Sequence, residues 1–225
     1  MDREVGQKSC SRWVPAAVLF AAAFLALASP WLSGRVTIPW DAKAQFLPQV
    51  QFLAASLAEG QSPFWAPYVF AGWPQIADPQ ALIFSPLHFL LAAFTADPGF
   101  RAVDAVTFAY LFLGGLGVIL FFRDRDWHMG GALVAALMFA CGGSAASRLQ
   151  HTGQLMSLAY LALALWLVAR TLERASWRAG LAAGVVAGLL AIERDQVAVL
   201  SLYVLAGFVL AHWMQSPRPL RRGKQ

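Results

Sequence analysis

The sequence predicts an all-helical integral membrane protein, and three observations support this fold class. Hydrophobic residues make up 59% of the 225 residues and charged residues only 13%, whereas a soluble domain is about half apolar and about a quarter charged. Several apolar stretches approach the roughly 20 residues that a helix needs to cross the hydrocarbon core. Basic residues lie in short clusters between these stretches, so the net charge of +5 indicates membrane topology and no nucleic-acid partner.

Six stretches are predicted to span the membrane: 14–33, 103–122, 130–146, 154–169, 179–192 and 197–213. The fifth is short, and its Gly180, Gly184 and Gly188 predict a bare helix face that another backbone can approach closely. The first also resembles a signal peptide, but its length favours an uncleaved anchor. The expected organisation is therefore an N-terminus (1–13), a first span (14–33), a long loop (34–102), a bundle of the second to sixth spans (103–213) and a basic tail (214–225).

The positions of Lys and Arg predict that both termini are cytoplasmic, because basic loops stay on the cytoplasmic side. With the N-terminus inside, twelve of the 17 basic residues fall on the inner side and five on the outer side. The inner residues are Arg3, Lys8, Arg12, Arg123, Arg125, Arg170, Arg174, Arg178, Arg218, Arg221, Arg222 and Lys224, and the outer ones are Arg35, Lys43, Arg101, Arg148 and Arg194. The inner clusters at 123–126 and 170–174 are interpreted as solvated loops that set this orientation.

The long outer loop is predicted to begin with an amphipathic helix that lies on the membrane. Its apolar face consists of Phe46, Leu47, Val50, Leu53, Ala54 and Leu57. Asp41 stands at the N-cap position, Gly60 lies just past the end, and Pro48 is expected to kink the helix. The later run 81–94 contains Pro86 and is too short to span, so an interfacial or re-entrant segment is predicted. If that run did cross, every later loop would change sides.

Between these helices the chain is rich in aromatic residues, prolines and glycines, which fix turns instead of continuing a helix. The segments 63–68 and 71–80 and the stretch 84–87 carry this pattern. They predict a rigid, aromatic-lined shelf that could seat a sugar or a lipid head group.

Short motifs in this loop resemble a known family. They are Asp41-x-x-x-Gln45, Pro63-x-Trp65-x-Pro67, Gly72-x-Pro74 with Asp78-Pro79-Gln80, and Ser85-Pro86-Leu87, followed later by the segments 147–154 and 193–196. Together they resemble bacterial YfhO-type membrane proteins of the C-type (GT-C) glycosyltransferase superfamily. The resemblance implies a multi-pass protein of the bacterial inner (plasma) membrane. It also implies transfer of a sugar from a polyprenyl-phosphate donor to a cell-envelope glycan, lipid or protein at the outer face. Members of this family usually carry more spans, so the resemblance implies an N-terminal portion, a truncated product or a minimal relative.

Asp41 is the predicted catalytic residue, because it matches the acidic residue near the start of the first outer loop in this family. A carboxylate at that place would take a proton from the acceptor hydroxyl or hold a divalent cation, the one cofactor considered. A helix cap without a catalytic role is the alternative. No phosphate-binding Gly-rich loop, His-Glu-x-x-His or paired-Cys motif is present, so ATP hydrolysis and zinc chemistry are unsupported.

Eight further residues are predicted to bind substrate: Gln45, Trp73, Asp78, Gln80, Arg148, His151, Arg194 and Asp195. Asp78 and Trp73 would shape the sugar site with the two glutamines, although Asp before Pro is also a common turn former. Arg148, His151 and Arg194 would hold the donor phosphate. The alternatives are a snorkelling arginine beside a polar histidine, and a salt-bridged hairpin at 193–195.

Two other functions remain open on the sequence. A transporter or flippase-like component would use Asp and Arg residues along a pathway, but no convincing internal repeat is found. A non-catalytic fragment or scaffold is favoured by the short chain length.

Overall fold

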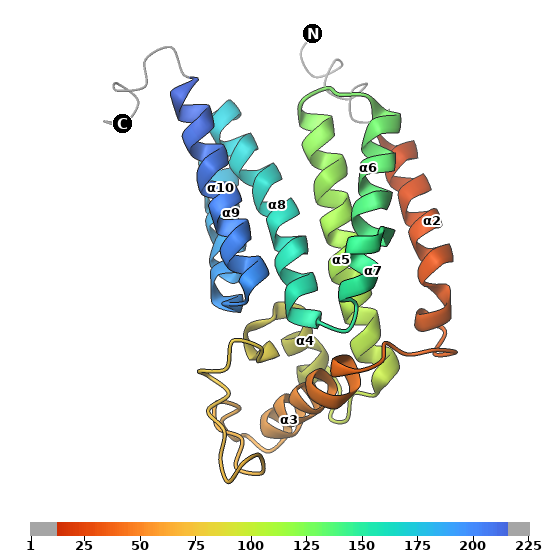
Figure 1. Ribbon diagram of the computed structural model, residues 1–225, viewed down its shortest axis with the longest axis vertical. Helices are drawn as coiled ribbons and strands as arrows, with labels where there is room; N and C mark the ends of the chain where they lie inside the picture. Colours follow the sequence, from red (N-terminus) through yellow and green to blue (C-terminus); the bar gives the residue numbers. More distant parts are fainter. Residues whose placement is uncertain (1–12, 216–225) are drawn as a thin grey trace.

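The computed structural model describes residues 13–215, and these residues form helices without any β-strand (Figure 1). The helices are α2 (Val14–Leu32), the π-helix η1 (Ala42–Phe46), α3 (Leu47–Ala58), the short 3₁₀ helix η2 (Leu82–Phe84), α4 (Pro86–Phe94), α5 (Phe100–Asp124), α6 (Met129–Cys141), α7 (Gly143–Arg148), α8 (Thr152–Arg174), α9 (Trp177–Glu193) and α10 (Gln196–Met214). Nearly all of the predicted cytoplasmic N-terminus and basic tail lies outside the described residues, and so do Arg3, Lys8, Arg12, Arg218, Arg221, Arg222 and Lys224.

Five helical stretches are long and apolar enough to cross a membrane: Val14–Leu32, Phe100–Asp124, Met129–Arg148, Thr152–Arg174 and Gln196–Met214. The predicted class of all-helical membrane protein agrees with this finding. The third stretch joins α6 and α7 across Gly142, whose extended backbone separates the two helices. The fifth predicted span, 179–192, corresponds to α9, which has 17 residues and is shorter than these five stretches.

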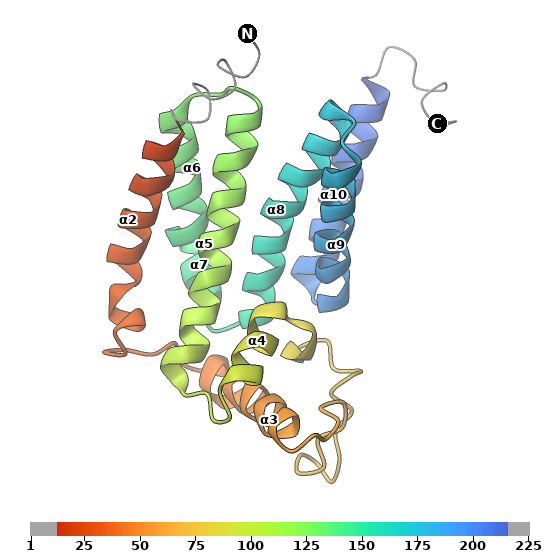
Figure 2. The ribbon, with the colours of Figure 1, turned by 180° about the vertical axis from the view of Figure 1, so that it is seen from behind.

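The long apolar helices lie side by side with α9, and the segment 34–99 forms a separate layer at one end of them (Figures 1 and 2). Helix α2 begins and α10 ends at the opposite end of the bundle. Helix α2 packs against α5 and α6, α5 packs against α8, and α8 packs against α9 and α10. This layer at the end of the bundle, residues 34–99, is called the end layer below.

Close packing inside the bundle depends on the glycines of α5 and not on those of α9. A Cβ atom on Gly115 would lie 2.2 Å from the ring of Phe20, and one on Gly114 would lie 2.4 Å from the ring of Phe139. By contrast, Gly184 and Gly188 have no atom of the described residues within 4 Å of that position. The predicted close approach of another backbone to this face of α9 is therefore not found among the described residues, because its one neighbour is the Thr171 side chain of α8, 3.3 Å from a Cβ built on Gly180.

The amphipathic helix of the end layer is present, but its apolar face is covered by protein. Val50, Leu53 and Ala54 are fully buried, and α3 packs against α4 and η2. The expectation that this face lies on the membrane is therefore corrected. Gly60 follows α3 with a positive φ of 66°, at the helix end that the sequence predicts. Pro48 lies in the first turn of α3, directly after the end of η1 at Phe46.

Helix α4 occupies only nine residues, too few to cross a membrane, which agrees with the predicted interfacial segment. Ser85 caps it, and the Ser85 hydroxyl also contacts Nδ1 of the buried His88 (2.7 Å) and the hydroxyl of Tyr110 in α5 (2.8 Å). Tyr160 of α8 donates a hydrogen bond to Tyr110 (3.1 Å). This chain of polar groups joins the end layer to two of the long helices.

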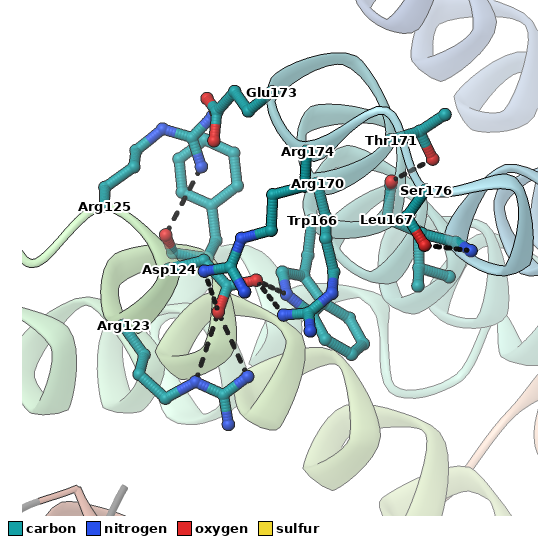
Figure 3. A network of polar contacts seen from close by, with 12 residues as sticks. Arg123, Asp124, Arg125, Trp166, Leu167, Arg170, Thr171, Glu173, Arg174 and Ser176 are labelled. Carbon is teal, nitrogen blue, oxygen red and sulfur yellow. Dashed lines mark hydrogen bonds and ion pairs between the residues drawn. The ribbon is translucent and has the colours of Figure 1, made fainter. Parts of the chain in front are cut away.

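At the opposite end of the bundle, one carboxylate connects α5 to α8 (Figure 3). The Asp124 side chain is only 4% exposed and pairs with Arg170 (2.6 Å), Arg123 (3.1 Å) and Arg174 (3.3 Å). The indole N–H of Trp166 donates to it as well (2.9 Å). The interpretation of these clusters as solvated loops is therefore wrong for Asp124, because its carboxylate is enclosed by the side chains of α8.

Candidate functional site

Asp41 and His151 lie in contact where the end layer meets the bundle. Nδ1 of His151 lies 3.1 Å from Oδ2 of Asp41, and the two side chains are 36% and 49% exposed. Asp41 precedes η1, whereas His151 lies in the turn between α7 and α8, so the pair joins segments 110 residues apart. Asp41 makes no side-chain cap of η1. Its carboxylate is therefore directed to His151 instead of to the helix end.

A neighbouring hydrogen bond indicates which ring nitrogen of His151 carries the proton. Its Nε2 lies 3.3 Å from the amide nitrogen of Gln150, a group that can only donate. With Nε2 as the acceptor, the neutral imidazole carries its proton on Nδ1 and donates it to Asp41. One carboxylate oxygen of Asp41 is then engaged, and the other has no protein partner within residues 13–215.

An unusual backbone places Asp41 at this position. Trp40 has a positive φ of 59°, a conformation that bulky residues rarely adopt, and its side chain is 74% exposed. The backbone N–H groups of Lys43 and Ala44 both donate to the Trp40 carbonyl (2.9 Å each), and the π-helix η1 follows. Strained residues and π-helical turns both occur preferentially at functional sites.

Arg148 lies at the end of α7, three residues before His151, and its guanidinium donates to the side-chain oxygen of Gln154. It is partly buried and has no carboxylate within ion-pair distance among the described residues. A partly buried cation with a neutral partner retains attraction for an anion. The structure therefore places Asp41 against His151, and Arg148 lies in the same turn region, where its backbone carbonyl accepts from the His151 N–H (2.8 Å).

Asp195 and Arg194 have other partners. The Asp195 carboxylate caps α10 by accepting from the backbone of Val197 (2.6 Å) and Ala198 (2.9 Å), and it also accepts from the Ser157 hydroxyl (2.7 Å). Arg194 donates to the backbone carbonyls of Ile76 (3.2 Å) and Asp78 (3.0 Å). These contacts favour structural roles for both residues over substrate binding.

A groove of about 600 Å³ runs between η1–α3 and the aromatic loop of the end layer. One wall carries Ala44, Gln45, Pro48, Gln49 and Phe52, and the other carries Ala66, Tyr68, Val69, Phe70, Trp73, Gln75 and Asp78. Three predicted substrate-binding residues, Gln45, Trp73 and Asp78, line this groove. Gln45 donates to Gln80 across the layer, and the Trp73 indole N–H donates to Asp78 (3.1 Å). Asp78 also accepts from the backbone of Gln80 (2.8 Å), so the predicted turn and the predicted site coincide.

The loop wall is held in shape by two backbone hydrogen bonds between Ala66 and Trp73, each of 2.8 Å. Gly72 closes the turn between them with a φ of 125°, and a Cβ there would lie 2.3 Å from the Trp65 ring. Only glycine fits this position. The turn presents Tyr68 and Phe70, which are 89% and 85% exposed.

Sequence reasoning missed two residues of this groove. Gln49 and Gln75 each have a buried side-chain oxygen without a hydrogen-bond partner among the described residues. Nothing in the sequence separates them from other glutamines. Their significance depends on burial, which only the folded chain defines.

The arrangement does not provide a ready metal site. Within residues 13–215 no group of three His, Cys, Asp or Glu side chains is placed to hold a metal ion. Asp41 and His151 alone supply fewer ligands than a resident divalent cation usually takes from a protein. No step is therefore assigned to a cation here.

Comparison with protein-family models, with curated proteins and with solved structures found no match for this chain. The resemblance to YfhO-type proteins thus stays a prediction.

Proposed function

We propose that this protein transfers a sugar from a polyprenyl-phosphate donor to an acceptor at the outer face of a bacterial inner membrane. In this proposal the chain crosses the membrane six times, with α9 as the fifth crossing and the end layer outside. The donor's prenyl chain lies in the bilayer, and its phosphate reaches the turn between α7 and α8. The acceptor is a glycan, lipid or protein of the cell envelope.

The reaction assigns one role to each of three side chains. The acceptor oxygen attacks the anomeric carbon of the donor sugar while its proton passes to Asp41. The bond between the anomeric carbon and the phosphate oxygen breaks, and polyprenyl phosphate leaves with the bonding electrons. Arg148 attracts the leaving phosphate through its planar set of N–H donors. His151 orients the Asp41 carboxylate by donating from Nδ1.

The observation that carries this proposal is the 3.1 Å contact between Asp41 and His151. It joins the start of the end layer to the turn between α7 and α8, and Arg148 lies three residues before His151 at the end of α7. A base for the acceptor and a cation for the phosphate are the two groups that the transfer needs. The strained Trp40 and the π-helix beside Asp41 support the same placement.

Asp41→Asn is the direct test. The asparagine side chain keeps an oxygen that can accept from His151, so folding should be unchanged, but it cannot take a proton at neutral pH. The purified full chain is reconstituted in liposomes with undecaprenyl phosphates that carry labelled glucose, galactose, mannose or N-acetylglucosamine. A cell-envelope extract supplies the acceptors. We expect transfer to fall by about 10²-fold or more, as for loss of a general base.

Glu59→Gln is the matched control, because Glu59 is an exposed carboxylate of the same end layer with no part in the site. It should transfer sugar as the unchanged protein does. Retained transfer in Asp41→Asn would refute the role of Asp41. Absence of transfer from all four donors by the unchanged protein would count against the proposed function itself.

A further inference from the structure

The groove between η1–α3 and the aromatic loop has two buried acceptors that no protein group satisfies. The side chains of Gln49 and Gln75 line opposite walls of the groove, and the side-chain oxygen of each is buried without a hydrogen-bond partner among residues 13–215. Gln75 is only 4% exposed. Buried polar atoms are nearly always paired, because an unpaired one loses its bond to water without replacement. Such oxygens inside a groove indicate a ligand that donates hydrogen bonds.

The remaining lining defines the rest of that ligand. Tyr68, Phe70 and Trp73 contribute aromatic surface, and the rings of Phe70 and Trp73 lie 5.8 Å apart. Such rings bind flat apolar faces, such as the C–H face of a sugar ring. Hydroxyl groups around the edge of that ring would donate to the two glutamine oxygens. Aromatic surface with convergent amide groups is typical of a site for a small polar ligand.

Charge excludes a phosphate from the same groove. Its only charged lining residue is Asp78, and none of the lining side chains found among the described residues is Lys or Arg. An anion would therefore meet a carboxylate and no counter-charge. The ligand that fits is uncharged.

The groove is also close to Asp41 along the chain. Ala44 and Gln45 line it and follow Asp41 by three and four residues on η1. Arg148, which attracts the phosphate in the proposed reaction, ends α7 three residues before His151, the member of the Asp41–His151 pair that belongs to the bundle.

We propose that this groove binds an uncharged oligosaccharide, held by hydroxyl donors to Gln49 and Gln75 and by stacking on the aromatic loop. This proposal deepens the proposed function by naming a neutral glycan as the acceptor. The acceptor role, but not the binding, rests on the proposed function. Binding itself requires no transfer, so the two can be tested apart.

Saturation-transfer NMR on the full chain in lipid nanodiscs provides the test. The probes are maltotriose, triacetylchitotriose and mannotriose, with trigalacturonate as the acidic counterpart and an uncharged peptide of alanine, serine and glutamine. At least one neutral trisaccharide should bind, and more tightly than the acidic sugar or the peptide. Failure of all three, or a preference for trigalacturonate or the peptide, overturns the proposal.

Three glutamine variants connect the binding to the groove. Gln75→Leu and Gln49→Leu each replace a glutamine by an apolar side chain of similar volume and so remove one hydrogen-bond acceptor. Each should raise the dissociation constant about fivefold. Gln61→Leu changes an exposed glutamine of the same layer, which does not line the groove, and should bind normally. Thermal unfolding of each variant shows whether it folds. Unchanged affinity in both folded groove variants would overturn the assignment.

Asp41→Asn separates this proposal from the transfer reaction. That variant should bind the neutral trisaccharide with unchanged affinity, because Asp41 does not line the groove. Binding without transfer in the unchanged protein would leave the groove assigned and refute the enzyme. Transfer without binding of any neutral glycan would support the enzyme and refute the assignment of the groove.

Discussion

The guanidinium of Arg194 donates a 3.0 Å hydrogen bond to the backbone carbonyl of Asp78. Arg194 ends α9 in a left-handed conformation with φ of 56°, and Asp78 lies in the aromatic loop that forms one wall of the groove. A second bond from the same nitrogen reaches the carbonyl of Ile76 (3.2 Å). The turn between α9 and α10 thereby fixes the loop against the bundle.

Arg194→Ala should release that loop. We expect faster hydrogen exchange across residues 72–80, because this segment loses both side-chain anchors, while exchange inside α5 and α8 stays slow. Hydrogen-exchange mass spectrometry measures the difference. Arg178→Ala removes an exposed arginine at the other end of the bundle and serves as the control. Unchanged exchange in the loop of Arg194→Ala would show that other contacts hold it.

Asp124→Ala should destabilise the opposite end of the bundle. The carboxylate is 4% exposed and bonds to three arginines and Trp166, so its removal leaves several donors unpaired. Because those arginines are 27–47% exposed, we expect a loss of about 2 kcal/mol, less than for a fully buried pair. Urea or thermal unfolding in detergent measures it. Glu173→Gln breaks only the pair with Arg125 (2.7 Å) and should cost less than about 1 kcal/mol. Equal effects of the two changes would contradict a special role for Asp124.

His88 should make stability depend on pH. Burial lowers the pKa of His88 from 6.5 to about 3, so between these values the unfolded chain binds a proton that the folded chain excludes. Stability is therefore full above about pH 7 and falls as the pH drops below 6.5, by up to about 1.4 kcal/mol per pH unit. Thermal unfolding between pH 4.5 and 7.5 tests this slope.

His88→Asn should flatten that profile, since asparagine does not titrate, whereas the exposed His128→Asn should leave it unchanged. If the slope persisted in His88→Asn, another group would be responsible for it.

The end layer should be accessible from outside the cell. In a chain with Cys10 and Cys141 replaced by serine, Gln61→Cys should react with a membrane-impermeant maleimide on intact spheroplasts. Ala175→Cys, in the turn between α8 and α9 at the other end, should react only after lysis. Protection of Gln61→Cys until lysis would invert the orientation derived from the basic residues and remove the proposed outer site.

The sequence predicted the helices of the end layer more accurately than their surroundings. The apolar positions from Phe46 to Leu57 define one helical face, and hydrophobic periodicity identifies such a face without showing what covers it. The face packs on α4 and η2, where the sequence predicted lipid. Gly184 and Gly188 show the same distinction, because a bare helix face requires a neighbour before it can pack closely.

The candidate site divides in the same way. Arg148 and His151 could be selected from residue type and loop position, whereas Asp41 was selected because it matches an acidic residue of the family that the sequence resembles. The direct contact between Asp41 and His151 could not be predicted, and neither could the use of Arg194 to anchor a loop. Gln49 and Gln75 carried no signal, because an amide is informative only when it is buried without a partner.

Taken alone, the sequence determined the all-helical class and the apolar stretches that form the five candidate membrane helices. These follow from composition and local periodicity, which act within a few helical turns. The tertiary structure decided that Asp41 contacts His151 across 110 residues, and that α3 and the aromatic loop enclose a groove. Those relations depend on how segments far apart in the chain pack together. Local sequence patterns do not determine which apolar face packs against which, because all the helices pack at once.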